Sequence, residues 1–165
     1  MNENHYPQAL WSEILPGLWQ GGTHDDDTTR SDRAPRQYPA KEEFDSVFTH
    51  YGPANPTGYA IKEIRYPFAD GDMTDLKPEE DLWLPVAEAH ADWKAGKRVL
   101  IRCQAGLNRS GLVMALTLIR EGYTPQDAID LMRRQRGPDA MCNRTFEQWL
   151  LNDADLEFWR GRMAA

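Results

Sequence analysis

The residues best suited to chemistry form one short segment, which reads Cys103-Gln104-Ala105-Gly106-Leu107-Asn108-Arg109-Ser110-Gly111. It follows KRVLIR, a run with an apolar, β-branched centre that predicts a buried strand over 97–102. It precedes LVMALTLI, apolar at seven of eight positions, which predicts a buried helix. A tight loop between a strand and a helix N-terminus directs its N–H groups toward a bound anion. The segment is therefore expected to form an anion cradle.

Within this cradle, each polar side chain suits one step of phosphate chemistry. Amides that bind an anion also stabilise a thiolate, which would make Cys103 a nucleophile at neutral pH. Arg109 lies six positions after Cys103. Its planar guanidinium can bind two phosphate oxygens at once, and it would bind them better in the transition state, in which the transferring group is flatter. Ser110 would donate its hydroxyl to the sulfur when the intermediate breaks down. Gly106 lets the backbone fold closely, and the amides would come from Gln104, Ala105, Gly106, Leu107 and Asn108.

Taken singly, these residues have plainer interpretations. Most free cysteines are buried structural thiols, and most arginines lie at the surface or in salt bridges. Asn108 is expected to hold the loop's shape through its side chain. The combination of strand end, Cys-x5-Arg-Ser, central glycine and following helix favours the phosphate cradle.

Cys103 to Ser110 also matches the Cys-x-x-Gly-x-x-Arg-Ser/Thr signature of the cysteine-dependent protein tyrosine phosphatases, and the chain resembles their dual-specificity branch. Four segments across residues 12–151 carry the resemblance: SEILPGLWQGG, IRYPFADGDMTDL, GKRVLIRCQAGLNRSGLV and RGPDAMCNRTFEQWL. The resemblance implies a phosphatase acting on phosphotyrosine, with phosphoserine and phosphothreonine as further candidates. It implies a cysteinyl-phosphate intermediate, no metal and no cofactor.

The family also implies a general acid on a loop upstream of the cysteine, because the leaving oxygen must be protonated. Alignment of the strand YPFA with the family pattern assigns this role to Asp70, 33 residues before Cys103. Asp72 is the alternative, and Asp75 is interpreted as a cap or loop anchor for the next helix. Arg102 stands where the family usually has histidine. Its guanidinium would either support the thiolate electrostatically or point away to solvent.

Strands and helices that would position these residues alternate along the chain. Strands are expected at 13–22, broken by the turn pair Pro16-Gly17, and at 44–49, 60–68 and 97–102. Helices are expected at about 82–93, directly after the cradle, at 124–134, and from 143 to a last apolar pair at 158–159. This order predicts one α/β domain over 1–165, protein tyrosine phosphatase-like, with a mostly parallel central sheet flanked by helices and a polar loop insertion at 23–43. Ligands of such sheets bind beyond the carboxyl ends of the strands.

Composition narrows the function classes. The 165 residues carry a formal net charge of −7, which disfavours nucleic acid and anionic membranes as partners. No apolar stretch is long enough to span a bilayer, and the first residues lack a secretory signal, so we expect a cytoplasmic protein. A phosphorylated protein is the expected partner, and the sequence assigns no oligomeric state.

Other candidate residues receive plainer interpretations. Cys142 is a possible resolving thiol for Cys103, although a small residue in a turn is the favoured interpretation. The basic group Arg133, Arg134 and Arg136 is expected to stabilise a helix dipole. No metal-ligand spacing relates the histidines, which are His5, His24, His50 and His90.

Two other functions remain open at this point. An inactive phosphatase-like module would bind phosphorylated partners without turnover, and Arg102 is the one feature that favours it. A phosphatase with the same chemistry would act on RNA 5′-phosphates or phosphoinositides, because the cradle recognises the phosphate rather than its carrier.

Overall fold

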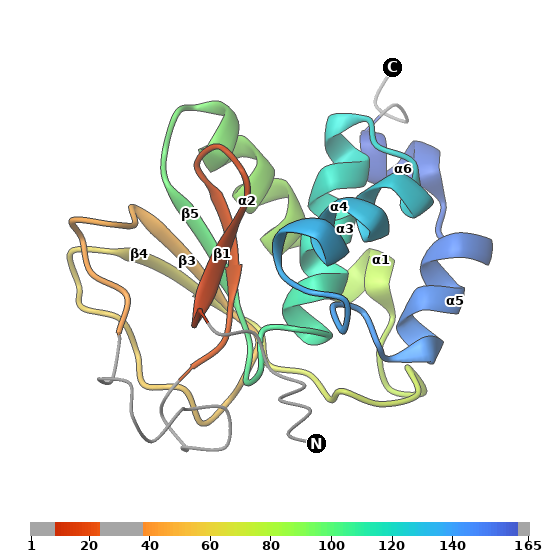
Figure 1. Ribbon diagram of the computed structural model, residues 1–165, viewed down its shortest axis with the longest axis horizontal. Coiled ribbons are helices and arrows are strands. Elements are labelled where there is room, and N and C mark those ends of the chain that lie inside the picture. Colours follow the sequence, from red (N-terminus) through yellow and green to blue (C-terminus); the bar gives the residue numbers. More distant parts are fainter. Residues whose placement is uncertain (1–8, 24–37, 162–165) are drawn as a thin grey trace.

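A five-stranded sheet forms the centre of the computed structural model, which describes residues 9–23 and 38–161 (Figure 1). Its strand order is β1-β2-β5-β3-β4, with bounds β1 Trp11–Leu15, β2 Leu18–Gly21, β3 Ser46–Thr49, β4 Lys62–Arg65 and β5 Val99–Arg102. Strands β2, β5, β3 and β4 pair in parallel, and β1 is antiparallel to β2 across the Pro16-Gly17 turn. The prediction of a mostly parallel α/β sheet is therefore confirmed.

The helices gather on one face of this sheet, to the right in Figure 1. Their bounds are α1 Pro78–Asp81, α2 Trp83–Lys94, α3 Arg109–Glu121, α4 Pro125–Gln135, α5 Arg144–Asn152 and α6 Leu156–Arg160. Helix α3 is central: it packs on β2 and β5 and is covered by α2, α4 and α6. Every residue of α3 from Ser110 to Ile119 is buried, as its apolar run predicted.

Two helix starts show why the chain folds locally in this way. Thr124 caps α4 by accepting a hydrogen bond from the Asp127 amide, and Pro125 follows as the first helical residue, as expected from the sequence. The predicted last helix is interrupted, because Asp155 caps a new helix, α6, after α5 has ended at Asn152. The expectation of one continuous helix was wrong at this break.

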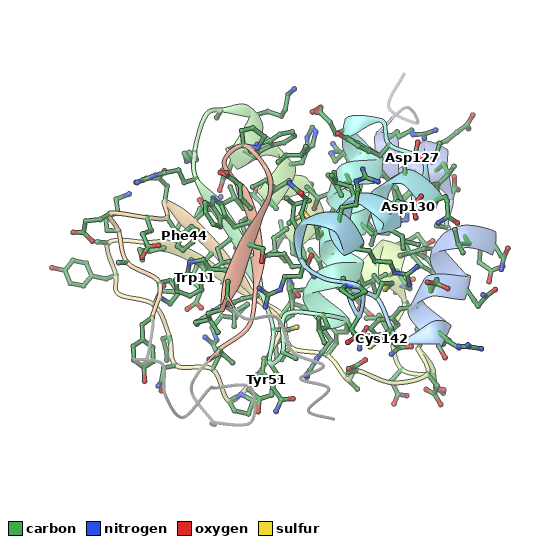
Figure 2. The ribbon with its side chains drawn as sticks, in the orientation of Figure 1. Trp11, Phe44, Tyr51, Asp127, Asp130 and Cys142 are labelled. Carbon is green, nitrogen blue, oxygen red and sulfur yellow. The ribbon has the colours of Figure 1, made fainter. Side chains whose placement is uncertain are left out.

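The second face of the sheet carries a smaller apolar cluster. Its buried members include Trp11, Phe44 and Leu100. The rings of Trp11 and Phe44, both labelled in Figure 2, pack edge to face with their centroids 5.3 Å apart. Side chains alternate along a strand, so Leu100 and Arg102 face this cluster while Ile101 faces the helices.

Some boundaries differ from the sequence expectations. Strands β3 and β4 are shorter than the predicted ranges 44–49 and 60–68, because the flanking residues form turns and loops. Asp75 does not cap a helix, since the N-cap of α1 is Lys77, whose amide binds Asp81. Most of the predicted polar insertion at 23–43 lies outside the described residues. Among the described residues, no helix is long and apolar enough to cross a membrane.

Candidate active site

The predicted cradle lies where β5 ends and α3 begins, at the carboxyl edge of the sheet. Residues 103–108 curve around a cavity of about 330 Å³. Gly106 has φ +74°, and a Cβ there would lie 2.5 Å from the Gly21 carbonyl carbon and 2.7 Å from the Gly22 nitrogen. Glycine is therefore required at 106 both by conformation and by space. The cavity is lined by Asp70, Cys103, Gln104, Ala105, Leu107, Asn108, Arg109, Asp139 and Cys142.

Cys103 forms the floor of this cavity. Cys103 is 2% exposed, and its backbone amide donates to the Gly21 carbonyl, which continues the parallel pairing of β5 with β2. The sulfur lies 3.2 Å from the Ser110 hydroxyl oxygen, within hydrogen-bond distance. Ser110 is itself fully buried in the first turn of α3. A sulfur beside a helix N-terminus and a hydroxyl donor is well placed to carry negative charge.

Arg109 brings a positive charge to the same cavity. One guanidinium nitrogen donates to Gln104 Oε1 at 3.2 Å, and the group stacks over the Tyr51 ring at 5.1 Å from its centroid. Its Nε is buried and has no hydrogen-bond partner among the described residues. A buried N–H without an acceptor is costly, so this atom fits an anion bound in the cavity.

Asp70 is held at the cavity by two asparagines from distant parts of the chain. The Asn143 side-chain amide donates to Asp70 Oδ1 at 2.7 Å, and the Asn108 amide donates to Oδ2 at 3.2 Å. The two asparagines are also joined, because the Asn143 backbone N–H donates to Asn108 Oδ1 at 2.9 Å. Asn143 additionally caps α5 through its own Oδ1. The sequence predicted a helix start near 143, but neither the capping side chain nor its contact with Asp70.

Asp72, the alternative acid, is engaged elsewhere. Its Oδ1 accepts hydrogen bonds from the Thr74 hydroxyl at 2.6 Å and the Thr74 amide at 3.0 Å. The hydroxyl bond and the amide bond together lower the pKa of Asp72 below its ordinary value. Asp72 is exposed and is not among the residues that line the cavity. Its geometry is that of a loop anchor rather than of a proton donor.

Arg102 takes neither of the two positions expected for it. It is 2% exposed and lies on the sheet face opposite the helices, where its Nε donates to Thr49 Oγ1 at 3.0 Å. A second nitrogen lies 3.3 Å from Glu63 and donates to the Asn55 carbonyl at 2.8 Å. The side chain therefore neither contacts the sulfur nor reaches solvent; it joins β5 to β3 and β4.

Arg136 has a different role from the predicted stabilisation of a helix dipole. It is 5% exposed, and its guanidinium lies behind the cradle, where burial lowers its pKa to about 10. Its five acceptors, at 2.8–3.3 Å, are the carbonyls of Ala9, Leu10, Ala105 and Gly106 and the Ser12 hydroxyl. Because the Ala105 and Gly106 carbonyls are held toward Arg136, this side chain fixes the backbone of the cradle from outside.

We expect Arg136→Met to lower the free energy of unfolding by about 3 kcal/mol, because it removes five hydrogen bonds of a buried guanidinium. Within the described ranges, only the Leu10 and Gly106 carbonyls of these five acceptors keep another donor, the Gly22 amide and Gln20 Nε2. Urea unfolding monitored by tryptophan fluorescence measures the change. Arg134→Met is the matched control, since Arg134 is exposed on the same helix and its loss should cost less than about 0.5 kcal/mol. Equal stability of the two variants would contradict this role for Arg136.

His50 is a buried histidine directly after β3. Its amide donates to the Arg102 carbonyl, and its Nδ1–H donates to the Tyr66 carbonyl at 2.8 Å. Its Nε2 is buried without a partner among the described residues. Burial, with a smaller contribution from the nearby Arg109 charge, lowers the pKa of His50 from 6.5 to about 4. The neutral imidazole is therefore the form that the fold accommodates.

This shift predicts a loss of stability in acid. Between pH 6.5 and 4 the unfolded chain binds a proton at His50 that the folded chain does not, so stability falls as pH falls through this window. The expected contribution is about 3 kcal/mol over the whole window. Urea unfolding at pH 7 and pH 4 should show a smaller loss for His50→Gln than for the wild type. Identical losses in the two proteins would contradict the assignment.

Cys142 lines the same cavity as Cys103, on the loop before α5. It is exposed, and its sulfur lies 3.5 Å from the Asn108 side-chain nitrogen. Figure 2 labels Cys142 and Tyr51, both in the lower half of the view. A resolving role stays a prediction. The described residues hold no group of three or more His, Cys, Asp or Glu side chains that could bind a metal.

The chain resembles known proteins both in sequence and in structure. The family model for the dual specificity phosphatase catalytic domain matches residues 48–155, which include the cavity-lining residues. Human protein tyrosine phosphatase type IVA 3 is 37% identical over 76 residues, which cover 46% of this chain and 43% of that protein. The match thus spans less than half the length of this relative.

Solved structures support the fold at lower sequence identity. A mouse putative dual specificity phosphatase, complexed with zinc tungstate, superposes with a TM-score of 0.68 at 22% identity, covering 94% of this chain and 89% of that one. Human DUSP28 superposes with a TM-score of 0.69 at 20% identity, and the superposition covers 94% of this chain and 97% of that one. These likenesses establish a shared architecture.

Proposed function

Because the chain belongs to the dual specificity phosphatase catalytic domain family, we propose that it hydrolyses phosphomonoesters through a cysteinyl-phosphate intermediate. Cys103 acts as nucleophile, Arg109 binds the phosphate, and Asp70 is the general acid and base. One observation carries this proposal: Cys103, Asp70 and Arg109, whose Nε has no hydrogen-bond partner in the described part of the chain, line one cavity.

In the first step, the Cys103 thiolate attacks phosphorus in line with the leaving oxygen, so that a P–S bond forms as the P–O bond breaks. Arg109 and the loop amides of residues 104–108 hold the non-bridging oxygens, where charge accumulates in the transition state. Asp70, in its protonated form, transfers its proton to the departing oxygen. Asn108 and Asn143 orient its carboxyl group.

In the second step, water attacks phosphorus on the side from which the first product left. Asp70, now a carboxylate, takes a proton from that water as the new P–O bond forms. The P–S bond breaks and Cys103 departs as a thiolate, toward which the Ser110 hydroxyl donates across the 3.2 Å separation. Inorganic phosphate is the second product, and the enzyme returns to its starting state.

The proposed substrates are phosphorylated proteins, with phosphotyrosine and then phosphoserine or phosphothreonine as the hydrolysed groups. The net charge of −7 disfavours polyanionic carriers such as 5′-phosphorylated RNA and phosphoinositides. A panel of a phosphotyrosine peptide, a phosphothreonine peptide, a phosphoinositide and a 5′-triphosphorylated RNA tests this preference. We expect kcat/KM to be highest for the phosphotyrosine peptide.

Rapid acid quenching during turnover of an aryl phosphate tests the covalent mechanism. The proposal expects phosphate to remain on the peptide that contains Cys103 and not on the peptide that contains Cys142. Binding of a phosphopeptide without turnover and without covalent phosphate would instead identify a phospho-binding module. Arg102, whose guanidinium is engaged with Glu63 rather than with the sulfur, stands where the family usually has histidine and is the feature that favours such a module.

A further inference from the structure

Gln20 is a buried polar residue that the mechanism above does not use. It lies on β2 at 0% exposure, on the sheet face covered by α3. Its side-chain nitrogen, Nε2, donates to the Gly106 carbonyl at 3.1 Å and lies 3.4 Å from the Ser110 hydroxyl oxygen. A buried side-chain amide lowers the stability of the fold unless its polar atoms form hydrogen bonds with neighbouring groups.

Its neighbours fix which way this amide points. The Gly106 carbonyl can only accept a hydrogen bond, so the nitrogen of Gln20 must face it. The same nitrogen then carries an N–H toward Ser110.

We propose that Gln20 is a positioning residue that orients the Ser110 hydroxyl toward the Cys103 sulfur. A hydroxyl has one proton and free rotation about its C–O bond. When the N–H of Gln20 occupies an acceptor position on the Ser110 oxygen, the hydroxyl proton is directed to the other neighbour, the sulfur at 3.2 Å. The inference rests on the proposed function, since it concerns the thiolate that departs in the second step.

The effect of Gln20 on the hydroxyl is separable from its effect on the loop. The Gly106 carbonyl also accepts a hydrogen bond from Arg136 Nε at 3.1 Å, so the backbone stays held when Gln20 is replaced. The first step depends on the loop amides and Arg109, whereas the donor to the sulfur matters most when the P–S bond breaks. A loss of Gln20 should therefore slow hydrolysis of the intermediate and spare its formation.

The test compares Gln20→Met, Ser110→Ala and the double variant with an aryl phosphate substrate. We expect Gln20→Met to slow the decay of trapped phosphoenzyme about tenfold, as for partial loss of a hydrogen bond to a charged group. Its kcat/KM, which reports the first step, should stay within about twofold of wild type. The double variant should decay no more slowly than Ser110→Ala, because Gln20 acts through that hydroxyl.

One control variant and one substitute variant keep the result specific. Ser46→Ala removes a buried hydrogen bond to Asp92 at the opposite end of the sheet and should leave decay unchanged. Gln20→Leu replaces the methionine variant if that protein does not fold. Unchanged decay in a folded Gln20 variant, or a double variant whose loss is the product of the two single losses, would overturn the inference. A wild type without any phosphoenzyme would instead overturn the proposed function, and this inference with it.

Discussion

Cys103→Ser is expected to lower the rate of aryl phosphate hydrolysis by at least about 10⁴-fold, as is typical when an enzyme loses its nucleophile. A serine hydroxyl stays protonated at neutral pH and is a much weaker nucleophile than the thiolate that the proposed mechanism uses. The substitution changes one buried atom and leaves Arg109 and the loop backbone in place. Steady-state kinetics with 4-nitrophenyl phosphate measure the loss.

Binding should survive this substitution. The cavity keeps the guanidinium of Arg109, and removal of a negative thiolate eliminates repulsion with the phosphate dianion. Isothermal titration of Cys103→Ser with a phosphotyrosine peptide should therefore show affinity equal to or above that of the wild type. Cys142→Ser is the matched control, because this thiol lines the same cavity yet has no part in the proposed steps. Comparable activity of Cys103→Ser and the wild type would exclude the covalent mechanism.

The part of the site that the sequence could predict is the part that is contiguous. A strand, a loop and a helix follow one another within residues 99–121, so the positions of Cys103 and Arg109 at one cavity, with Ser110 beside the sulfur, follow from local structure. The capping of α4 by Thr124 was predictable for the same reason. The central parallel sheet also followed from the alternation of strands and helices.

Contacts between distant segments could not be predicted in this way. Gln20 reaches Gly106 and Asn143 reaches Asp70 across 86 and 73 residues of chain. Arg136 was interpreted as a helix-end charge because its helix alone gave no sign that Leu10 and Ala105 converge on it. Arg102 was expected near the sulfur or in solvent. The alternation of side chains along β5, which places positions 102 and 103 on opposite faces, is the signal that would have placed it correctly.

Asp70→Ala is expected to lower kcat by about 10²–10³-fold for a phosphotyrosine peptide, the range typical of general acid catalysis. The loss should be much smaller for 4-nitrophenyl phosphate, whose leaving group departs without protonation. Asp72→Ala should change kcat by less than about twofold, since Asp72 bonds to Thr74 and does not line the cavity. Stopped-time assays with both substrates across the pH range measure these differences.

The pH dependence separates the two carboxylates further. A general acid must hold its proton, so the rate falls at alkaline pH when that proton is lost. At acid pH the rate falls for a different reason, because the nucleophile must be a thiolate. With the phosphotyrosine peptide, Asp70→Ala should therefore remove the alkaline limb of the kcat/KM profile and retain the acid limb. Asp72→Ala should retain both limbs. If the alkaline limb persisted in Asp70→Ala and disappeared in Asp72→Ala, the proton would come from Asp72, and the hydrogen bonds from Asn108 and Asn143 would serve only to hold the loop.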